Sequence, residues 1–356
     1  MQQALAGVVA PNTGKDFVST KALKNLQVNE GDVAFDVELG YPAKSQIPGL
    51  RTALIAAAKG VPGVQNVSVN ISSKIVAHAA QRGVALLPNV KNIVAVASGK
   101  GGVGKSTTAV NLALALAAEG AAVGLLDADI YGPSQPMMMG IQGRPESSDG
   151  KTMEPLENYG VEVMSIGFLV NQDEAMIWRG PMATQALEQL LRQTNWGDLD
   201  YLIVDMPPGT GDIQLTLSQR VPMTGAVIVT TPQDIALLDA KKGIKMFEKV
   251  GVPILGIVEN MAVHICSQCG HAEHIFGEGG GKRMAEQYGM DYLGALPLDI
   301  KIRLQVDSGK PTVVADPDGE VAGIYKAVAR QVAIKIAAKA KDFSSKFPSI
   351  KISKET

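Results

Sequence analysis

A glycine-rich stretch constrains the fold of this chain more than any other part: residues 99–107 read Gly-Lys-Gly-Gly-Val-Gly-Lys-Ser-Thr. An apolar run at 93–97 precedes it, and an alanine- and leucine-rich run at 109–118 follows it. This order predicts a buried strand, a tight turn and a helix, which is the context that a phosphate-binding loop requires. The residues predicted to surround the phosphates are Gly99, Lys100, Gly101, Gly102, Val103, Gly104, Lys105, Ser106 and Thr107.

The chemistry of this stretch suits a nucleoside triphosphate and Mg²⁺. Its glycines allow backbone N–H groups to approach phosphate oxygens, and the N-terminus of the following helix adds partial positive charge. Lys105 would contact the β- and γ-phosphates, and the Ser106 hydroxyl would bind Mg²⁺. An ordinary phosphate-binding loop has no need of a lysine directly after its first glycine, so Lys100 requires a separate explanation.

The composition argues against several classes of protein. With 356 residues, of which 46% are apolar, the chain can bury a large core and form more than one domain. A net charge of −2 argues against nucleic acid as the main partner, and only two cysteines are present, so no disulfide framework exists. The first ten residues do not resemble a signal peptide, and no apolar run reaches membrane-spanning length. We therefore expect a cytoplasmic protein with no nucleic-acid and no membrane partner.

Residues 1–83 are typical of a small α+β domain. Alternating apolar residues predict strands at 33–39 and 64–71, and helical spacing predicts a helix at 49–59. A short linker, 84–92, connects this domain to the rest of the chain.

The larger part of the chain, 93–345, alternates apolar strands with helical patterns, and 346–356 forms a C-terminal tail. Strands are predicted at 93–97, 122–126, 161–166, 201–204, 226–229, 254–258 and 292–295. Helices are predicted at 105–119, 182–192, 235–250, 281–288 and 321–341. This alternation indicates an α/β fold, a doubly wound and mostly parallel sheet with helices on both faces. Ligands bind such sheets at the carboxyl ends of the strands, where residues 99–107 lie.

The final predicted helix, 321–341, is amphipathic and basic. Its apolar residues recur at helical spacing, and lysines and an arginine occupy other positions. We expect this helix to pack on the sheet with its basic face in water. The alternative is a helix that lies on an acidic membrane surface.

Acidic residues follow two of the predicted strands. Asp127 and Asp129 come after the strand at 122–126, and Asp205 directly follows the strand at 201–204. Carboxylates at such strand ends hold Mg²⁺ and its waters or orient the attacking water, although a simple turn or cap also explains either Asp127 or Asp129 alone. Asp205 is the natural Walker B residue, and the turn-rich segment 206–212 after it could respond to the γ-phosphate.

A second group of reactive residues is the pair Cys266 and Cys269, which can direct two thiolates at one soft metal. Two thiolates fill half of a tetrahedral centre. Nearby histidines at 264, 271 and 274 could complete a zinc site within one chain, or the same loop of a second subunit could complete a four-thiolate [4Fe–4S] site on a two-fold axis. A thioredoxin-like redox pair is disfavoured, because the motif follows a late strand.

These motifs together are similar to those of a known group of ATPases. The loop at 99–107, with its additional lysine, resembles the deviant Walker A motif of the MinD, ParA and nitrogenase iron-protein superfamily. Over nearly all of residues 90–340 the chain resembles the Mrp/ApbC group of iron–sulfur cluster carrier ATPases. The segments that carry this narrower resemblance are 126–134, 205–212, 259–261 and the Cys-x-x-Cys pair at 266–269.

The resemblance implies roles for individual residues. Lys100 would contact nucleotide across a dimer interface, so that ATP draws two subunits face to face. Asp129 would be the water-orienting acid of switch I, and Asp205 would begin switch II. The residues expected at the adenine or beside it are Asn260, Pro297 and Asp299.

The first 83 residues resemble the small iron–sulfur-assembly domain that is often fused ahead of such ATPases, through segments 11–16 and 33–39. In that domain a cysteine commonly follows the second strand, whereas this chain has Tyr-Pro-Ala-Lys-Ser at 41–45. We therefore expect this domain to dock a partner rather than to bind metal.

The leading hypothesis is an ATP-hydrolysing homodimer that carries a [4Fe–4S] cluster between paired Cys266 and Cys269. It would deliver the cluster to apo iron–sulfur proteins and work with cluster-assembly proteins. Its catalytic residues would be Lys100, Lys105, Asp129 and Asp205. The alternatives are a MinD- or ParA-like positioning ATPase and an ATPase with a structural zinc clip.

Overall fold

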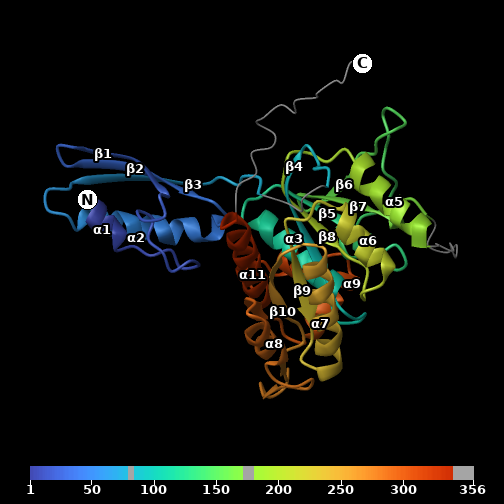
Figure 1. Cartoon of the computed structure of the whole chain (residues 1–356). Coiled ribbons are helices and arrows are strands. Elements are labelled where there is room, and N and C mark those ends of the chain that lie inside the picture. The colour runs from blue at the N-terminus through green and yellow to red at the C-terminus, as the bar shows by residue number, and fades with distance from the viewer. Residues whose placement is uncertain (79–83, 171–179, 340–356) are drawn as a thin grey trace.

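The computed structural model describes residues 1–78, 84–170 and 180–339. In these residues a three-stranded sheet and an eight-stranded sheet belong to two domains, and a two-stranded hairpin forms a third, small sheet. A small N-terminal domain projects from one side of a larger α/β domain (Figure 1). Parallel strands flanked by helices confirm the predicted fold class of the larger domain. The predicted tail, 346–356, lies outside the described residues.

The N-terminal domain consists of a three-stranded sheet and its helices. The elements are α1 (Gln2–Ala6), β1 (Leu23–Asn29), β2 (Asp32–Leu39), η1 (Lys44–Gln46), α2 (Ile47–Lys59) and β3 (Asn66–Ser73). Strand β2 is central, antiparallel to β1 and parallel to β3, and its alternate residues are buried. The predicted strands and helix correspond to β2, β3 and α2. Strand β1 was not predicted, because a register shift between Lys24 and Gln27 interrupts its alternation.

The large sheet has eight strands in the order β13-β10-β9-β4-β8-β5-β7-β6. Their bounds are β4 (Val90–Ala97), β5 (Val123–Asp127), β6 (Leu156–Asn158), β7 (Val161–Ser165), β8 (Leu199–Asp205), β9 (Gly225–Thr230), β10 (Ile254–Glu259) and β13 (Tyr292–Ala295). Neighbouring strands are parallel except for β6, which is antiparallel to β7 at one edge. Strand β4 begins at Val90, three residues before the predicted start, because Val90 already pairs with Leu199 of β8.

Helices surround this sheet, and a small hairpin extends from it. The helices are α3 (Lys105–Ala118), α4 (Gln135–Met138), η2 (Ile166–Phe168), α5 (Gly180–Gln193), α6 (Asp212–Arg220), α7 (Asp234–Lys249), α8 (Gly280–Tyr288), α9 (Ile300–Asp307), α10 (Thr312–Ala315) and α11 (Glu320–Ala337). The hairpin pairs β11 (His264–Ile265) with β12 (Ala272–Glu273). The central strands are almost wholly buried, so the sheet itself forms the main core.

The last described helix, α11, packs against α3 on the side of the sheet that faces the N-terminal domain (Figure 1). Tyr325, Val332 and Ile336 are buried on its inner face. The packed position that we favoured for this helix is therefore observed, with an end at Ala337 instead of 341. Within the described ranges, no helix is long and apolar enough to cross a membrane.

The N-terminal domain contacts the large domain through the segment that follows β2. The backbone N–H of Lys44 donates to the Glu119 carbonyl at 3.1 Å, and the Ser45 hydroxyl donates to the Glu119 carboxylate at 2.6 Å. Glu119 follows the last residue of α3, the helix that starts at the glycine-rich loop. One helix thus connects the predicted nucleotide site to the interface between the domains.

Candidate functional site

The glycine-rich loop joins β4 to α3 in a conformation that only small residues accommodate easily. Gly102 and Gly104 have φ angles of 81° and 82°. A Cβ atom on Gly104 would collide with the side-chain amide of Asn260, and one on Gly99 would collide with the backbone of Asp239 in α7. Glycine is therefore required at these positions by the backbone conformation and by close packing, and a glycine-rich turn at the start of a helix fits the predicted phosphate cradle.

Lys105 lies at the start of α3 and is almost fully buried, with 6% of its surface exposed. Its Nζ donates to Oδ1 of Asp205, which ends β8, and to the Ser106 hydroxyl at 3.0 Å. A lysine and a carboxylate buried together compensate each other's charge. The structure brings together the lysine, the Mg²⁺-binding hydroxyl and the Walker B aspartate that the sequence predicted.

Gln135 also belongs to this site, although we did not predict it. Its Nε2 donates to Oδ2 of Asp205 at 2.8 Å and to the carbonyl of Ser106 at 3.1 Å, and it is fully buried. Its Oε1 and the Ser134 hydroxyl are buried without a hydrogen-bond partner among the described residues. Nothing in the sequence distinguishes Gln135 from other polar turn residues, and only the fold places it beside Asp205.

The two acidic residues after β5 have different environments. Oδ2 of Asp127 accepts hydrogen bonds from the backbone of Ser134 and Gln135 and from the Ser165 hydroxyl, so Asp127 anchors the loop that follows it. Burial, and then the charge of Asp205, raises the pKa of Asp127 to about 7. Asp129 is only partly buried, and this desolvation raises its pKa. Asp129 is thus the carboxylate of the two that a ligand can reach.

The segment after Asp205 is tied to the glycine-rich loop. The Gly209 N–H donates to the carbonyl of Ser98, the residue that precedes the loop, at 3.1 Å. Gln214 of α6 makes two hydrogen bonds to the same segment. Its Nε2 donates to the Pro207 carbonyl, and its Oε1 accepts from the Gly211 N–H. A change at the phosphates can therefore be transmitted to segment 206–212 through the backbone.

Asn260, Pro297 and Asp299 follow two adjacent strands at the same edge of the sheet, β10 and β13. The Asn260 amide donates to the Val103 carbonyl at 2.9 Å, so this residue lies directly against the glycine-rich loop. Asp299 caps α9 by accepting from the Lys301 N–H at 2.8 Å, and Pro297 lies in the turn before it. Glu259, beside Asn260, is a further buried polar residue that we missed. Its carboxylate accepts from the Gly281 N–H at the start of α8.

The cysteines lie in the turn of the β11–β12 hairpin. Cys266 is half-buried and Cys269 is exposed. The backbone N–H of Gln268, and then the N–H and thiol of Cys269, lower the pKa of the Cys266 thiol. The pair therefore presents a reactive thiol at the surface.

The histidines around this turn do not complete a metal site within one chain. Nδ1 of His264 lies 3.0 Å from the Leu298 carbonyl, and Nδ1 of His274 lies 2.7 Å from the Ala262 carbonyl. In the part of the chain that the structure describes, no three His, Cys, Asp or Glu side chains form a group that could hold a metal ion.

Comparisons with known proteins agree with this geometry. Residues 89–333 match the family described as "NUBPL iron-transfer P-loop NTPase", and residues 1–71 match the family "Iron-sulfur cluster assembly protein". A relative from Escherichia coli (strain K12), named "Iron-sulfur cluster carrier protein", is 51% identical over 93% of this chain and 90% of its own length. A protein of the same name from Pseudomonas fragi is 63% identical over 77% of this chain and 96% of its own length.

A solved structure shares the fold of the larger domain. It is a nucleotide-binding protein from Archaeoglobus fulgidus in complex with ADP, 38% identical, with a TM-score of 0.57 over 65% of this chain and 90% of the other. Together with the buried lysine–aspartate pair and the glycine-rich loop, these matches show that the chain belongs to the iron-transfer P-loop NTPase family.

Proposed function

We propose that this chain is an ATP-hydrolysing homodimer that carries a [4Fe–4S] cluster between the Cys266 and Cys269 pairs of two subunits and transfers it to apoproteins. The observation that carries this proposal is the pair of a half-buried and an exposed cysteine in one surface turn of a P-loop NTPase chain. One chain supplies two thiolates where a cluster requires four ligands. The names of the relatives, which are iron–sulfur cluster carriers, support the same cargo.

The nucleotide chemistry follows from the buried site. Backbone N–H groups of the glycine-rich loop and Lys105 would hold the phosphates, while Ser106 would bind Mg²⁺ directly and Asp205 would bind its waters. Mg²⁺ would neutralise charge that develops on the phosphate oxygens. Asp129, partly buried and with a raised pKa, would orient the attacking water and accept its proton. Asn260, with Pro297 and Asp299 nearby, would form the adenine side of the pocket.

The surface around this site supports a dimer. Large apolar side chains are exposed in segments that follow the carboxyl ends of strands, the edge at which the glycine-rich loop lies. They are Tyr131, Met137, Ile235, Leu238, Ile265, Ile275, Ile300 and Leu304, each more than half exposed. Lys100 is exposed in the same loop, which suits a side chain that contacts the nucleotide of a second subunit. Such exposed apolar surface is typical of an interface.

Anaerobic reconstitution tests the cargo. The full chain, supplied with iron and sulfide, should show thiolate-to-iron absorbance, about four irons and four sulfides per dimer, and transfer of the cluster to an apoprotein. A colourless protein that retains stoichiometric zinc would contradict the proposal. The zinc clip is disfavoured because, among the described residues, the two cysteines and the nearby histidines do not come together in a group that could hold a metal ion. A positioning ATPase leaves the cysteine pair without a role.

A further inference from the structure

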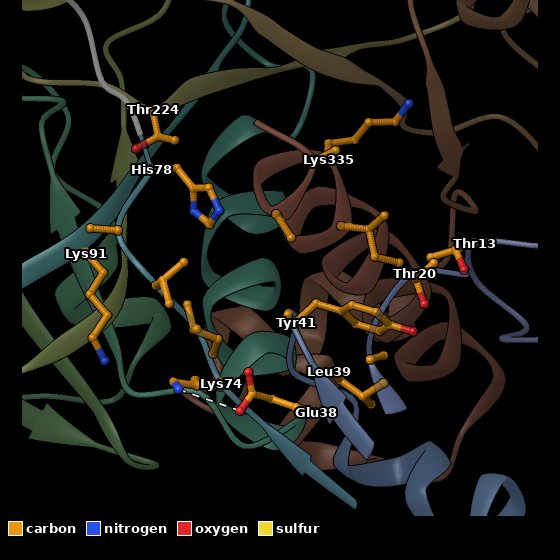
Figure 2. A pocket seen from close by; sticks show the side chains of 18 of the residues that line it. Thr13, Thr20, Glu38, Leu39, Tyr41, Lys74, His78, Lys91, Thr224 and Lys335 are labelled. Carbon is orange, nitrogen blue, oxygen red and sulfur yellow. Dashed lines mark ion pairs between the residues drawn. The ribbon is translucent and has the colours of Figure 1, made fainter. Parts of the chain in front are cut away.

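A cleft between the two domains is separate from both the predicted nucleotide site and the cysteine pair, because none of their residues lines it. Its volume is about 1440 Å³, and both domains line it. The N-terminal domain contributes the segment before β1 and the start of that strand, the end of β2 and the segment after β3. The large domain contributes the segment before β4, Thr224 before β9, and the end of α11 (Figure 2).

The cleft lies at the opposite edge of the sheet from the glycine-rich loop. Its residues Asn89 and Val90 are at the start of β4 and Thr224 directly precedes β9, whereas the loop follows the end of β4. Since β4 and β9 are parallel, their starts and ends lie at opposite edges. A dimer that closes over the nucleotide edge therefore leaves this cleft open in each subunit.

The cleft is basic, in contrast to the chain as a whole. Of the described residues, six lysines and two acidic residues line it: Lys15, Lys21, Lys24, Lys74, Lys91, Lys335, Glu38 and Asp198. Lys74 pairs with Glu38 at 3.6 Å inside the cleft (Figure 2), and Lys91 and Lys335 pair with aspartates that do not line it. Within the described ranges, the exposed lysines 15, 21 and 24 form no ion pair.

The lining also shows which kind of anion fits. The volume exceeds the roughly 300–1,000 Å³ of small-molecule sites. Lys74, Lys91 and Lys335 lie apart in Figure 2 instead of converging on one point. Among the described residues that line the cleft there is no arginine, and the aromatic ones, Phe17 and Tyr41, are more than 90% buried, so these residues offer bases no exposed ring on which to stack. Apolar side chains, such as the half-exposed Leu86, lie between the charges.

We propose that this cleft binds an acidic polypeptide segment that also carries apolar side chains, supplied by a partner protein. Carboxylates would pair with the lysines of both domains, and apolar side chains would contact the surface between them. That the partner is an acceptor of the cluster rests on the proposed carrier function. The binding itself does not depend on it.

Binding of a labelled peptide to the full chain tests this inference. The peptide alternates glutamate pairs with leucine or phenylalanine, and fluorescence anisotropy measures its Kd on metal-free protein. We expect binding that weakens as salt rises, because the lysines at the rim remain solvent-exposed. Reversal of the three unpaired lysines (Lys15→Glu, Lys21→Glu and Lys24→Glu together) should raise the Kd about tenfold or more, or about 1.4 kcal/mol.

A matched variant controls for net charge. Arg51→Glu, Lys59→Glu and Lys245→Glu change the charge by the same amount at exposed positions that do not line the cleft. We expect this variant to bind the peptide within about twofold of the wild type. Both variants should retain ATP turnover, which shows that they are folded.

Besides a failure to bind the peptide, three results would overturn the proposal. One is an equal loss of affinity in the two variants. Another is equally tight binding of a peptide with glutamine in place of glutamate. The third is tighter, cleft-dependent binding of single-stranded DNA than of the peptide, which would assign the cleft to nucleic acid. If the protein binds the peptide but holds no cluster, only the proposed carrier function is contradicted. If it transfers clusters but does not bind the peptide, only the proposed role of the cleft is contradicted.

Discussion

Arg330 of α11 donates from Nη1 to Oε1 of Glu119 at 2.6 Å, and this ion pair is buried at the junction of the two domains. The Glu119 side chain is fully buried and that of Arg330 is 12% exposed. The same carboxylate accepts from the backbone and the hydroxyl of Ser45 in the N-terminal domain. A single carboxylate thus connects the end of α3, the last described helix and the N-terminal domain.

Replacement of Glu119 should destabilise the fold. Glu119→Ala leaves the Arg330 charge buried without its partner, and we expect a loss of about 3 kcal/mol or more in the free energy of unfolding, measured by urea titration. Asp307→Ala is the control, because it breaks the exposed pair of Arg303 and Asp307 and should cost less than about 1 kcal/mol. Equal losses of unfolding free energy in the two variants would show that the buried pair stabilises the fold no more than an exposed pair does.

Lys100→Ala should separate hydrolysis from binding. Lys100 is exposed, and in the proposed dimer its charge contacts the nucleotide of the second subunit, whereas Lys105 is buried in its own site. We expect ATP turnover and ATP-dependent dimer formation to fall on the order of a hundredfold, while some nucleotide binding is retained. Lys245→Ala, at an exposed position on α7, should leave all three quantities unchanged. Normal turnover in Lys100→Ala would exclude a role across the interface.

Cys266→Ala should remove the cluster and spare the nucleotide site. The hairpin that holds Cys266 lies outside the glycine-rich loop, and the thiol is only half-buried. We expect reconstituted iron to fall to background, ATP affinity to stay within about twofold, and stability to change by less than about 0.5 kcal/mol. Ser267→Ala, one residue along the same turn, should bind iron normally. Full iron content in Cys266→Ala would show that the ligands lie elsewhere.

The titration of Asp127 should appear in the pH dependence of stability. Its pKa is about 7 in the folded chain because of burial and the nearby Asp205, and its ordinary value is near 4. The protonated group therefore stabilises the fold below about pH 4, and this contribution is lost as the pH rises to about 7.

Urea titrations across this pH range, without nucleotide, measure the effect. Relative to Asp127→Asn, the wild type should lose at most about 4 kcal/mol of unfolding free energy as the pH rises. The asparagine side chain of this variant cannot titrate, but it keeps an oxygen that can accept hydrogen bonds from the loop. Parallel pH profiles would contradict the raised pKa.

Much of the site was predictable because its signals are local. Lys105 and Ser106 belong to a short motif between a strand and a helix, and Asp205 ends an apolar run, so topology alone brings them to the same edge of the sheet. Gln135 and Glu259 were not predictable in this way. Their roles depend on hydrogen bonds to residues 70 and 22 positions away, and no local pattern encodes those contacts.

The sequence alone determined the parallel α/β sheet, the position of the phosphate-binding loop and the cysteine pair, because periodicity and short motifs act over a few residues. Only the tertiary structure decided how the domains meet. Glu119 and Arg330 are 211 residues apart in the chain, and the basic cleft is built from segments of both domains. Such contacts arise when the buried faces of distant helices and strands pack together, and their partners are set by the whole fold.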